Sequence, residues 1–387
     1  MRQCQLESYL RESHAVVTAY LEDKNGKHWV KLDSTLFYAE AGGQPADNGW
    51  IGNVKVIDVQ RKGSEVWHQT ETPIEPKSYP IEIDWTRRFD HMQQHTGQHM
   101  LTALILEHFG WMTLGFQLGT DLSTIELDTS SIDRSTCLEI EALANACIVS
   151  DKAVRHQLID RSKLEELGVR TRGLPEYVNG PIRLIEIENL DLNTCGGTHV
   201  ERTGELQVCK ILGTESIRGR TRLQFLFGGR VLQYCESAFL HEQSLNKAIG
   251  QGREAHVGLI EKWQLEKKIQ MKVMSRLENQ LADAVAVNLS ADQGVVVYHD
   301  PYASLEWCVC LVRKCVDKEA DTAIFVSGEE TFVLYDPHHI VSEHREEVLR
   351  ILNGRGGGRP PWMQGKCARP DQIKSVADWY RRICALN

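Results

Sequence analysis

The sequence predicts an α+β protein of several domains, and three observations support this. Residues 1–85 alternate polar and apolar side chains between turn-rich runs, which predicts a β-rich, barrel-like N-terminal domain. Residues 86–235 begin with a strongly helical run and continue with mixed strands and helices. The chain has 387 residues, which is enough for two or three domains with separate apolar cores.

A helical connector is predicted for residues 236–290. This stretch lacks proline and carries regularly spaced apolar residues among many Gln, Glu and Lys. It favours one long helical segment despite Gly250, Gly252 and Gly258. An exposed apolar stripe on such a helix would make the connector a candidate for homodimer formation.

Residues 291–387 predict a C-terminal α/β domain. Expected strands include EWCVCLVRKCV and TAIFVSG, and HHIVSEHREEVLRILN is an expected helix. Strand alternation would place Cys308 and Cys310 on one packed face, so these thiols and Cys315 are assigned to the core rather than to a second metal site.

Composition indicates an ordinary globular protein of the cytoplasm. No run approaches the roughly 18 apolar residues of a membrane span, and MRQCQLESYLRESH lacks the apolar core of a secretory signal. The 11 cysteines are an odd number, which argues against a disulfide framework and leaves thiols for metal or core. The net charge of -9 excludes an indiscriminate nucleic-acid coat but allows local basic patches.

Two pairs of residues predict a metal site. His95 and His99 lie four apart on a helix expected over 90–109, so both imidazoles project from one face. Cys195 and His199 flank a short turn in NTCGGTHV. Taken alone, the two histidines could equally be an ordinary exposed or core pair. The cysteine, taken alone, could be a small buried apolar residue. Together, three imidazoles and one thiol predict one Zn²⁺ per chain, with iron as the alternative metal.

The predicted site differs from that of a metalloprotease. In HTGQH no Glu follows the first histidine, so the usual general base is missing. A reactive zinc would have to polarise a carbonyl or acidify water by itself, and an activated ester would suit it. A closed, purely structural site remains an alternative. His91 shares the histidine face but is read as a solvent-exposed residue at the helix start, outside the metal set.

Two basic, glycine-containing segments are candidate phosphate contacts, although arginines in solvated loops are the plainer interpretation. SIRGRTRLQFLFGGR and NGRGGGRPPWMQGKCARP contribute Arg218, Arg220, Arg222, Arg230, Arg355, Arg359, Lys366 and Arg369. The Gly-Lys pair at 365–366 lacks the spacing of a nucleotide-binding P-loop, so no use of ATP is expected.

Four segments resemble the long form (AlaX type) of the alanyl-tRNA editing proteins, relatives of the editing and C-terminal regions of alanyl-tRNA synthetase. These segments, which spread over nearly the whole chain, are FYAEAGGQPADNG, RRFDHMQQHTGQHMLTAL, CGGTHVERTGELQVCKI and GRGGGRPPWMQGK. The resemblance implies hydrolysis of mischarged Ser-tRNA(Ala), and of Gly-tRNA(Ala), with Ala-tRNA(Ala) spared. It also implies that the C-terminal domain grips tRNA. Because no ATP-dependent aminoacylation core is recognised in the sequence, editing in trans is expected.

By position, the resemblance implies a zinc-binding editing pocket formed by His95, His99, Cys195 and His199. Gln117 in GFQLGT matches a polar pocket position, and Thr96 and Gln98 lie on the histidine helix. The synthetase commonly has threonine where this chain has Gln98.

Two alternative functions remain at this stage. The editing module of threonyl-tRNA synthetase, which would act on Ser-tRNA(Thr), shares both ligand pairs. A non-catalytic RNA-binding protein with a structural zinc would also carry them.

Overall fold

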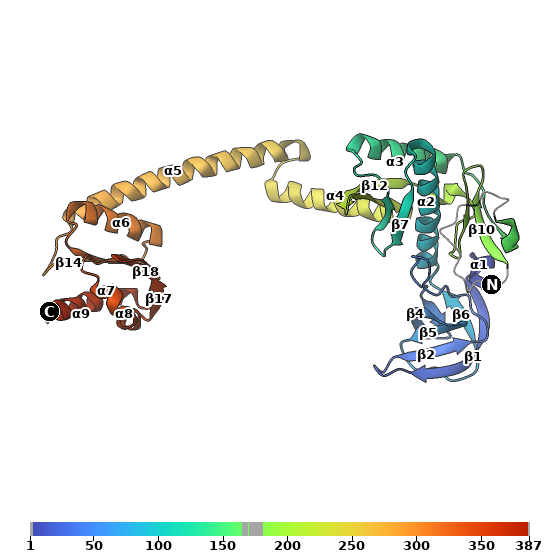
Figure 1. Ribbon diagram of the computed structural model, residues 1–387, viewed down its shortest axis with the longest axis horizontal. Helices are drawn as coiled ribbons and strands as arrows, with labels where there is room; N and C mark the ends of the chain where they lie inside the picture. Colours follow the sequence, from blue (N-terminus) through green and yellow to red (C-terminus); the bar gives the residue numbers. More distant parts are fainter. Residues whose placement is uncertain (1–2, 165–168, 170–180, 386–387) are drawn as a thin grey trace. The chain divides into compact units, whose positions relative to one another are not determined.

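The computed structural model describes residues 3–164, 169 and 181–385 (Figure 1). The chain divides into two compact units, Met1–Leu245 and Asn246–Asn387. The first unit holds both the predicted barrel and the predicted metal-binding region. The second holds the C-terminal α/β domain. The four-domain division expected from the sequence is finer than this and stays a prediction.

The N-terminal strands form a closed antiparallel barrel, which confirms the barrel-like domain. Its strand order is β1-β2-β5-β4-β3-β6. Alternate residues such as Val30, Ile51 and Val56 fill the interior and are fully buried. The strands are β1 (Glu12–Glu22), β2 (His28–Leu32), β3 (Gly49–Ile51), β4 (Val54–Lys62), β5 (Glu65–Thr70) and β6 (Ser78–Ile83).

Helix α2 (Trp85–Phe109) carries the two predicted histidine ligands and confirms the expected helix, with a start five residues earlier than Asp90. Asp84 caps its first turn by accepting a hydrogen bond from the Arg87 backbone N–H. Gly110 ends it in the left-handed region with φ 70°. Almost every residue from 91 to 105 is buried. A helix buried all round needs internal partners for its polar side chains.

One buried ion pair joins α2 to the barrel. Arg88 is fully buried and pairs with Asp47, in the loop between β2 and β3. The guanidinium also donates to the carbonyl oxygens of Leu36, at 2.8 Å, and Ser8, at 3.0 Å. Asp47 accepts the backbone N–H of Tyr38 at 2.6 Å. The charge is thus surrounded by acceptors from two segments, the N-terminal segment and the loop between β2 and β3, as a buried arginine requires.

The rest of the first unit forms two sheets around α2 and α3 (Arg134–Val149). A four-stranded antiparallel sheet has the order β12-β13-β8-β7, and a three-stranded sheet has the order β11-β10-β9. Phe225 and Phe227 fill the space between the first sheet and α2. The strands are β7 (Thr113–Leu118), β8 (Ser123–Leu127), β9 (Val154–Ile159), β10 (Ile182–Ile187), β11 (Asp191–Thr194), β12 (Cys209–Ile217) and β13 (Arg220–Phe227).

The predicted connector is helical but interrupted. Helix α4 (Gly229–Ile249) ends at Gly250, which has a φ of 75°, and α5 (His256–Asn288) begins after a short 3-10 turn. A left-handed residue cannot continue an α-helix, so Gly250 ends the first helix. Gly258 is tolerated inside α5.

The second unit contains a five-stranded sheet of order β14-β15-β16-β18-β17. Helix α6 (Leu305–Lys318) covers one face, and α8 (Arg345–Leu352) and α9 (Ile373–Cys384) cover the other (Figure 1). The strands are β14 (Val295–His299), β15 (Ala323–Ser327), β16 (Thr331–Tyr335), β17 (Gly354–Gly357) and β18 (Trp362–Cys367).

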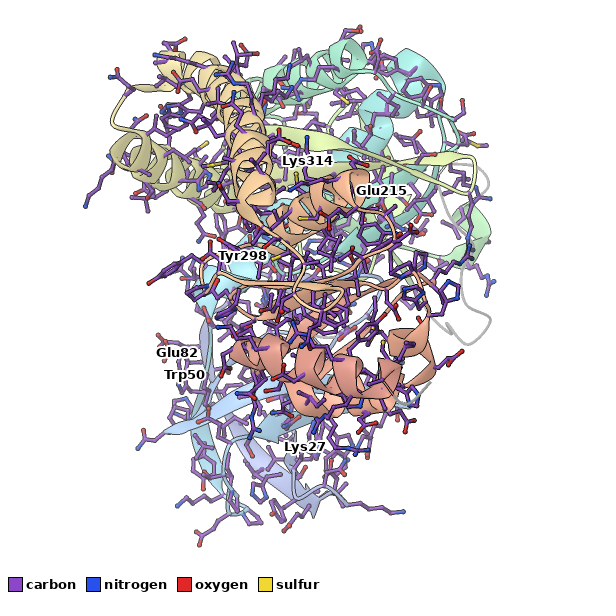
Figure 2. All side chains as sticks on the ribbon, turned by 90° about the vertical axis from the view of Figure 1, so that its left-hand side faces the viewer. Lys27, Trp50, Glu82, Glu215, Tyr298 and Lys314 are labelled. Carbon is purple, nitrogen blue, oxygen red and sulfur yellow. The ribbon has the colours of Figure 1, made fainter. Side chains whose placement is uncertain are left out.

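The expected strand EWCVCLVRKCV is wrong, because this segment is helix α6. Its buried residues are Trp307, Cys308, Leu311, Val312 and Cys315, which have helical spacing. Ser304 caps the helix by accepting the Trp307 N–H. The placement of Cys308 and Cys315 in the core is nevertheless correct, whereas Cys310 is only partly buried because it lies on the side of the helix toward Asn279. On the exposed side, Lys314 of α6 pairs with Asp283 of α5 at 2.8 Å (Figure 2).

Two smaller expectations for this unit are also revised. The expected helix HHIVSEHREEVLRILN is split by His344 into α7 (Ile340–Glu343) and α8. The glycine-rich run expected to be a loop forms β17, in which Gly356 is paired with Gly365 of β18. A side chain on either glycine would collide with the opposite backbone.

No helix among the described residues is long and apolar enough to cross a membrane. The cytoplasmic location remains a prediction.

We predict that Asp47→Ala destabilises the protein much more than loss of an exposed ion pair. Removing the carboxylate leaves Arg88 charged and buried, which costs about 3–5 kcal/mol. Glu65→Ala is the control, because its pair with Lys31 is 35% and 42% exposed and contributes under about 1 kcal/mol. Urea denaturation followed by tryptophan fluorescence measures both. Equal effects of the two substitutions would show that Arg88 finds other compensation.

Candidate metal centre

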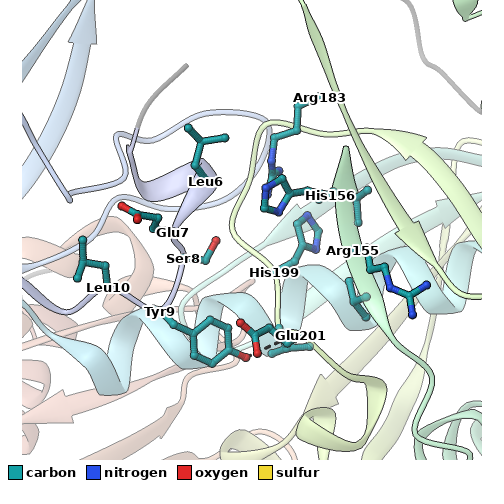
Figure 3. Close-up of a pocket in the computed structure, with 13 residues that line it drawn as sticks. Leu6, Glu7, Ser8, Tyr9, Leu10, Arg155, His156, Arg183, His199 and Glu201 are labelled. Carbon is teal, nitrogen blue, oxygen red and sulfur yellow. Dashed lines mark hydrogen bonds between the residues drawn. The ribbon is translucent and has the colours of Figure 1, made fainter. Parts of the chain in front are cut away.

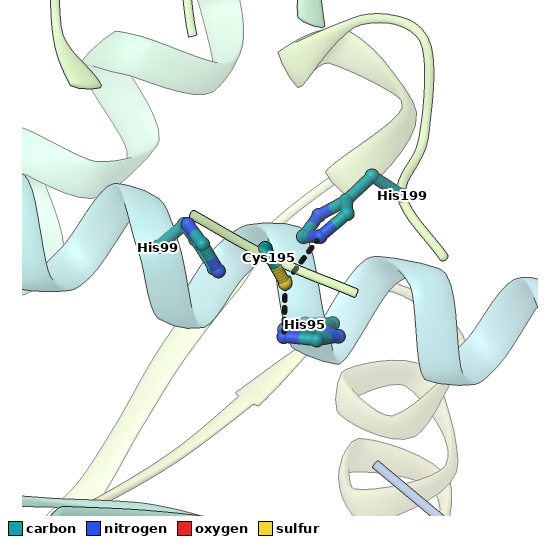
Figure 4. Close-up of side chains that lie close together, drawn as sticks. All are labelled: His95, His99, Cys195 and His199. Carbon is teal, nitrogen blue, oxygen red and sulfur yellow. Dashed lines mark hydrogen bonds between the residues drawn. The ribbon is translucent and has the colours of Figure 1, made fainter. Parts of the chain in front are cut away.

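Four side chains from distant parts of the chain converge in the first unit. His95 and His99 come from α2, and Cys195 and His199 come from the loop after β11 (Figure 4). Their candidate ligand atoms all lie within 4.8 Å of one another. Cys195 Sγ is 3.4 Å from His95 Nε2 and 3.3 Å from His199 Nε2. The predicted convergence of the two half-sites is therefore confirmed.

Each of the three imidazoles is held through its Nδ1 atom. A hydrogen bond at this atom fixes the ring orientation and leaves Nε2 for a metal ion. The three contacts are His95 with Gln44 Oε1 at 2.8 Å, His199 with Thr96 Oγ1 at 3.0 Å, and His99 with Asp191 Oδ2 at 3.3 Å. Such partners are typical of metal-binding histidines rather than of histidines that merely fill a core.

The ligand loop is shaped by Gly197 and Arg183. A Cβ atom on Gly197 would collide with the His95 ring and with Gln44, so no larger residue fits without displacing a ligand. Arg183 Nη1 donates to the carbonyl oxygens of Cys195, at 3.0 Å, and Gly197, at 2.8 Å. The Gly197 N–H also lies 3.4 Å from Cys195 Sγ. The loop thus presents the sulfur to α2.

The electrostatics of the cluster favour a deprotonated sulfur. Burial alone would raise the pKa of Cys195, but the surrounding imidazoles hold it well below its usual range. Burial, together with His95, keeps the pKa of His199 well below its ordinary value. Burial also opposes the charged form of His99, yet Cys195 and Asp191 together raise its pKa to about 9. A thiolate and neutral imidazoles are the forms that bind metal, so His99 must release a proton on binding.

This donor set fits a zinc ion. Three imidazole nitrogens and one thiolate form a borderline-soft, four-ligand set of the kind that zinc occupies. The histidines are only 2%, 4% and 5% exposed, in the order His95, His99 and His199, whereas Cys195 is partly exposed. Cys195 is therefore the least enclosed of the four residues.

The other two predicted residues on α2 lie in different environments. Thr96 is fully buried, and its hydroxyl contacts His199 and accepts the Val200 N–H at 3.2 Å. It therefore supports a ligand. Gln98 donates to Thr102 Oγ1 at 2.8 Å, and its own buried Oε1 has no hydrogen-bond partner within the described ranges.

Gln117 is not brought into the cluster. It lies on β7 with an exposed side chain. Its neighbour Phe116 lies near the His95 ring, with a centroid separation of 6.0 Å. Adjacent strand residues point to opposite faces, so Gln117 faces away from the cluster. Its pocket role stays a prediction from the family resemblance.

His91 is not the solvent-exposed residue that the sequence suggested. It is 1% exposed, and its Nδ1 has no partner in the part of the chain that the structure describes. Burial, with nearby Arg87 and Arg230, lowers its pKa to about 3. It is consequently a neutral residue one turn before His95.

The four arginines predicted as phosphate contacts in the first unit fall into two groups, exposed ones and ones that pair with carboxylates. Arg218 and Arg220 are exposed at the turn between β12 and β13. Arg222 is paired with Glu126 at 2.7 Å and with Glu215 at 3.4 Å. Arg230 as a phosphate contact is wrong, because it is buried and bound through two nitrogens to Asp90.

The basic residues of the second unit are exposed on and beside one hairpin. Arg355 of β17 and Lys366 of β18 are cross-strand partners, and Arg359 lies in the connection between these strands. Arg369 follows β18 and is also exposed. Their role in binding tRNA remains a prediction.

Sequence reasoning missed Gln44, Asp191 and Arg183. Gln44 lies in the quoted glycine-rich segment, but its contact with His95 spans 51 positions. Asp191 stands four residues before Cys195, a spacing that carries no recognisable signal by itself. A buried arginine in an apolar strand, as in PIRLIEI, was the one visible signal for Arg183.

Known proteins are similar to this chain in sequence. Residues 182–223, which contain Cys195 and His199, match the family described as "Threonyl and Alanyl tRNA synthetase second additional domain". Alanyl-tRNA editing protein Aarsd1 of Danio rerio is 36% identical over 387 residues, covering 94% of this chain and 93% of that protein. Alanyl-tRNA editing protein AlaX-M of Methanosarcina acetivorans is 33% identical over 225 residues, covering 53% and 89%. An alanine–tRNA ligase of Pyrococcus abyssi is 29% identical, covering 96% of this chain and 42% of the ligase.

The fold and the four-residue cluster thus define a protein of the class that carries this synthetase-associated domain. Within this class, the chain belongs to the family of alanyl-tRNA editing proteins, as the resemblance implied.

We predict that Gln44→Leu weakens zinc binding about 10- to 100-fold, because the acceptor that fixes the His95 ring is lost. Gln44→Glu keeps an acceptor oxygen and should bind zinc much closer to the wild-type affinity. Competition against a chromogenic chelator measures both constants. Equal affinities for wild type and Gln44→Leu would show that the barrel loop does not orient the ligand.

Proposed function

We propose that this protein is a zinc-dependent hydrolase that removes serine, and also glycine, from mischarged tRNA(Ala) in trans and spares Ala-tRNA(Ala). The observation that carries the proposal is the enclosed His95, His99, Cys195 and His199 cluster in a chain of this family. The relatives named as alanyl-tRNA editing proteins support tRNA as the partner.

The chain's own residues would hold the metal and orient it. His95, His99, Cys195 and His199 are the ligands, and Gln44, Thr96 and Asp191 fix the three rings. The chemistry that a bound zinc ion supplies is Lewis-acid activation of an ester or of a water molecule. No carboxylate stands on α2 between the two histidines, which supports ester hydrolysis rather than peptide hydrolysis.

Preference for serine over alanine would come from polar groups that pair only with a hydroxyl. A site built this way leaves its groups unpaired with alanine, which gives discrimination of up to about 10⁴-fold. Gln98 is a candidate, because its Oε1 is buried and lacks a partner among the described residues. Gln117 is the other candidate, by family position. Thr96 acts through His199 in this proposal and not through the substrate.

Two observations bear on the alternatives. The Aarsd1 relative is matched over 93% of its length, which favours the alanine system over editing of Ser-tRNA(Thr). The partial exposure of Cys195 favours an accessible centre over a closed structural zinc in a non-catalytic RNA-binding protein.

Phosphate contacts would come from both units. In the first unit, exposed Arg218 and Arg220 are the available cations, while Arg222 would first have to leave its carboxylates. In the second unit, Arg355, Arg359 and Lys366 line one hairpin.

A homodimer through the connector is the remaining part of the proposal. Helix α5 exposes four aliphatic residues at intervals of four, and they are 43–54% exposed. They are Ile269, Val273, Leu277 and Leu281. A stripe of this kind on a 33-residue helix is normally covered by a partner.

We predict rapid release of serine and glycine from tRNA(Ala) by the zinc-loaded protein, with Ala-tRNA(Ala) and Ser-tRNA(Thr) left intact. Cys195→Ala and His95→Ala should each lower the rate by more than about 100-fold, because a ligand is lost. Cys235→Ala is the matched control, since this thiol is exposed on α4. Deacylation assays with the four labelled tRNAs provide the measurement. Hydrolysis that survives in Cys195→Ala would exclude zinc catalysis, and preferential loss from Ser-tRNA(Thr) would favour the threonine system.

We predict that the wild type sediments as a dimer and that the double substitution Ile269→Glu with Leu277→Glu yields a monomer. The reason is that charges would replace two aliphatic side chains that the dimer interface would bury. Lys268→Glu is the control on the same helix. Sedimentation equilibrium gives the masses. A monomeric wild type would show that the stripe is not a dimer interface.

A further inference from the structure

A hollow of about 280 Å³ lies beside the metal ligand His199 (Figure 3). The segment that follows α1 (Gln3–Leu6) forms one wall, and β9 and β10 form the other. Leu6, Leu10, Val154 and Ile185 are its apolar lining. Among the residues assigned so far to binding zinc or substrate, His199 is the one that lines this hollow.

Arg183 is the unusual residue of this hollow. It is only 7% exposed, and no carboxylate is paired with it within residues 3–164 and 181–385. The other two deeply buried arginines, Arg88 and Arg230, each bind an aspartate. Burial lowers the pKa of Arg183, and the sulfur of Cys195 is the largest opposing influence, so compensation comes from a metal ligand rather than from a paired carboxylate.

The two edges of the Arg183 guanidinium are used differently. Nη1 donates twice, to Cys195 O and Gly197 O, and so holds the ligand loop. Nε is buried and has no hydrogen-bond partner, and no bond to Nη2 is found among the described residues. The Nε–Nη2 edge is the fork that binds carboxylate or phosphate oxygens through two parallel hydrogen bonds. This edge is therefore without a partner in the described part of the chain, and Nε itself is buried.

His156 of β9 lies next to Arg183 in the hollow (Figure 3). Burial, and then the charge of Arg183, lower its pKa, which places the two groups in electrostatic contact. A neutral imidazole can still donate one hydrogen bond. The carboxylates that line the hollow, Glu7 and Glu201, lie away from Arg183 in the view of Figure 3. The Arg183 end is therefore the end suited to an anion.

We infer that Arg183 and His156 form a subsite for a phosphate group of the nucleic-acid substrate, next to its acylated end. The inference rests on the proposed function. In an aminoacyl-tRNA the ester and the 5′ phosphate of the last nucleotide are separated by a single ribose. Arg183 touches the backbone of ligand Cys195 through Nη1 and also lines the hollow, so both groups would be bound within one short span.

The test compares two substrates, Ser-tRNA(Ala) and 3′-O-seryl-adenosine, which carries the ester without phosphate. Arg183→Gln and His156→Ala should raise KM for Ser-tRNA(Ala) about tenfold and about threefold, respectively, as expected for a charged and a neutral phosphate contact. His156→Ala should leave kcat/KM for seryl-adenosine unchanged. Arg183→Gln also loosens the ligand loop, so it should lower kcat/KM for both substrates, with the larger loss for Ser-tRNA(Ala). Arg155→Ala is the matched control, because Arg155 also borders the hollow but its side chain points away from Arg183 and lies 4.0 Å from Glu188 (Figure 3).

Three results would overturn the inference. Equal losses with both substrates, together with lower zinc content, would mean that Arg183 only holds the ligand loop. An unchanged KM for Ser-tRNA(Ala) would mean that no phosphate is bound. A rise in KM with Arg155→Ala as large as that with His156→Ala would indicate a general effect of positive charge near the hollow rather than a specific phosphate subsite. If Arg183→Gln does not fold, His156→Ala decides by the same comparison.

Failure of the proposed function can be separated from failure of this subsite. If the wild type hydrolyses neither substrate, binding of uncharged tRNA(Ala) is measured against salt concentration. The logarithm of the binding constant decreases linearly with the logarithm of the salt concentration. The magnitude of this slope should be smaller by about one in Arg183→Gln, as expected for one lost phosphate contact. A slope equal to that of the wild type would overturn the subsite.

Discussion

The metal cluster depends on how one loop of the barrel holds one face of α2. Asp47 binds Arg88 and Gln44 binds His95, and both acceptors lie in the glycine-rich segment between β2 and β3. Arg88 and His95 are seven residues apart, which is about two helical turns, so they share a face of the helix. The loop therefore holds α2 at two positions along the helix, Arg88 and His95. The Gln44 amide also bonds Thr198, so the same loop positions the second half of the site.

The sequence allowed prediction of the ligands because their signals are local. The spacing of His95 and His99 matches one helical turn, and Cys195 and His199 lie within one short loop. The contacts between segments that are distant in the sequence could not be predicted from such local signals. Arg230 looked like a free cation because its partner Asp90 lies 140 positions away. Gln44 likewise carries no mark of its function until the barrel loop is brought to α2.

The error at α6 has a different cause. In EWCVCLVRKCV, apolar residues at 308, 310 and 312 suggest alternation, whereas burial at 307, 308, 311, 312 and 315 follows a helix. Short apolar runs fit both periods, and a cap decides between them. Ser304 is that cap, since its hydroxyl accepts the Trp307 N–H at 3.1 Å. Recognition of the cap would have predicted the helix, and the sheet order would still have required tertiary contacts.

The exposure of the cluster determines from where a substrate can approach it. The three histidines are almost completely enclosed, and Cys195 is the least enclosed of the four residues. The carbonyl of this same residue accepts from Arg183, which also lines the hollow beside His199. Four protein ligands often close a zinc site, yet zinc accepts a fifth ligand in some transition states. An approach to the centre is therefore least obstructed at Cys195, the least enclosed of the four residues.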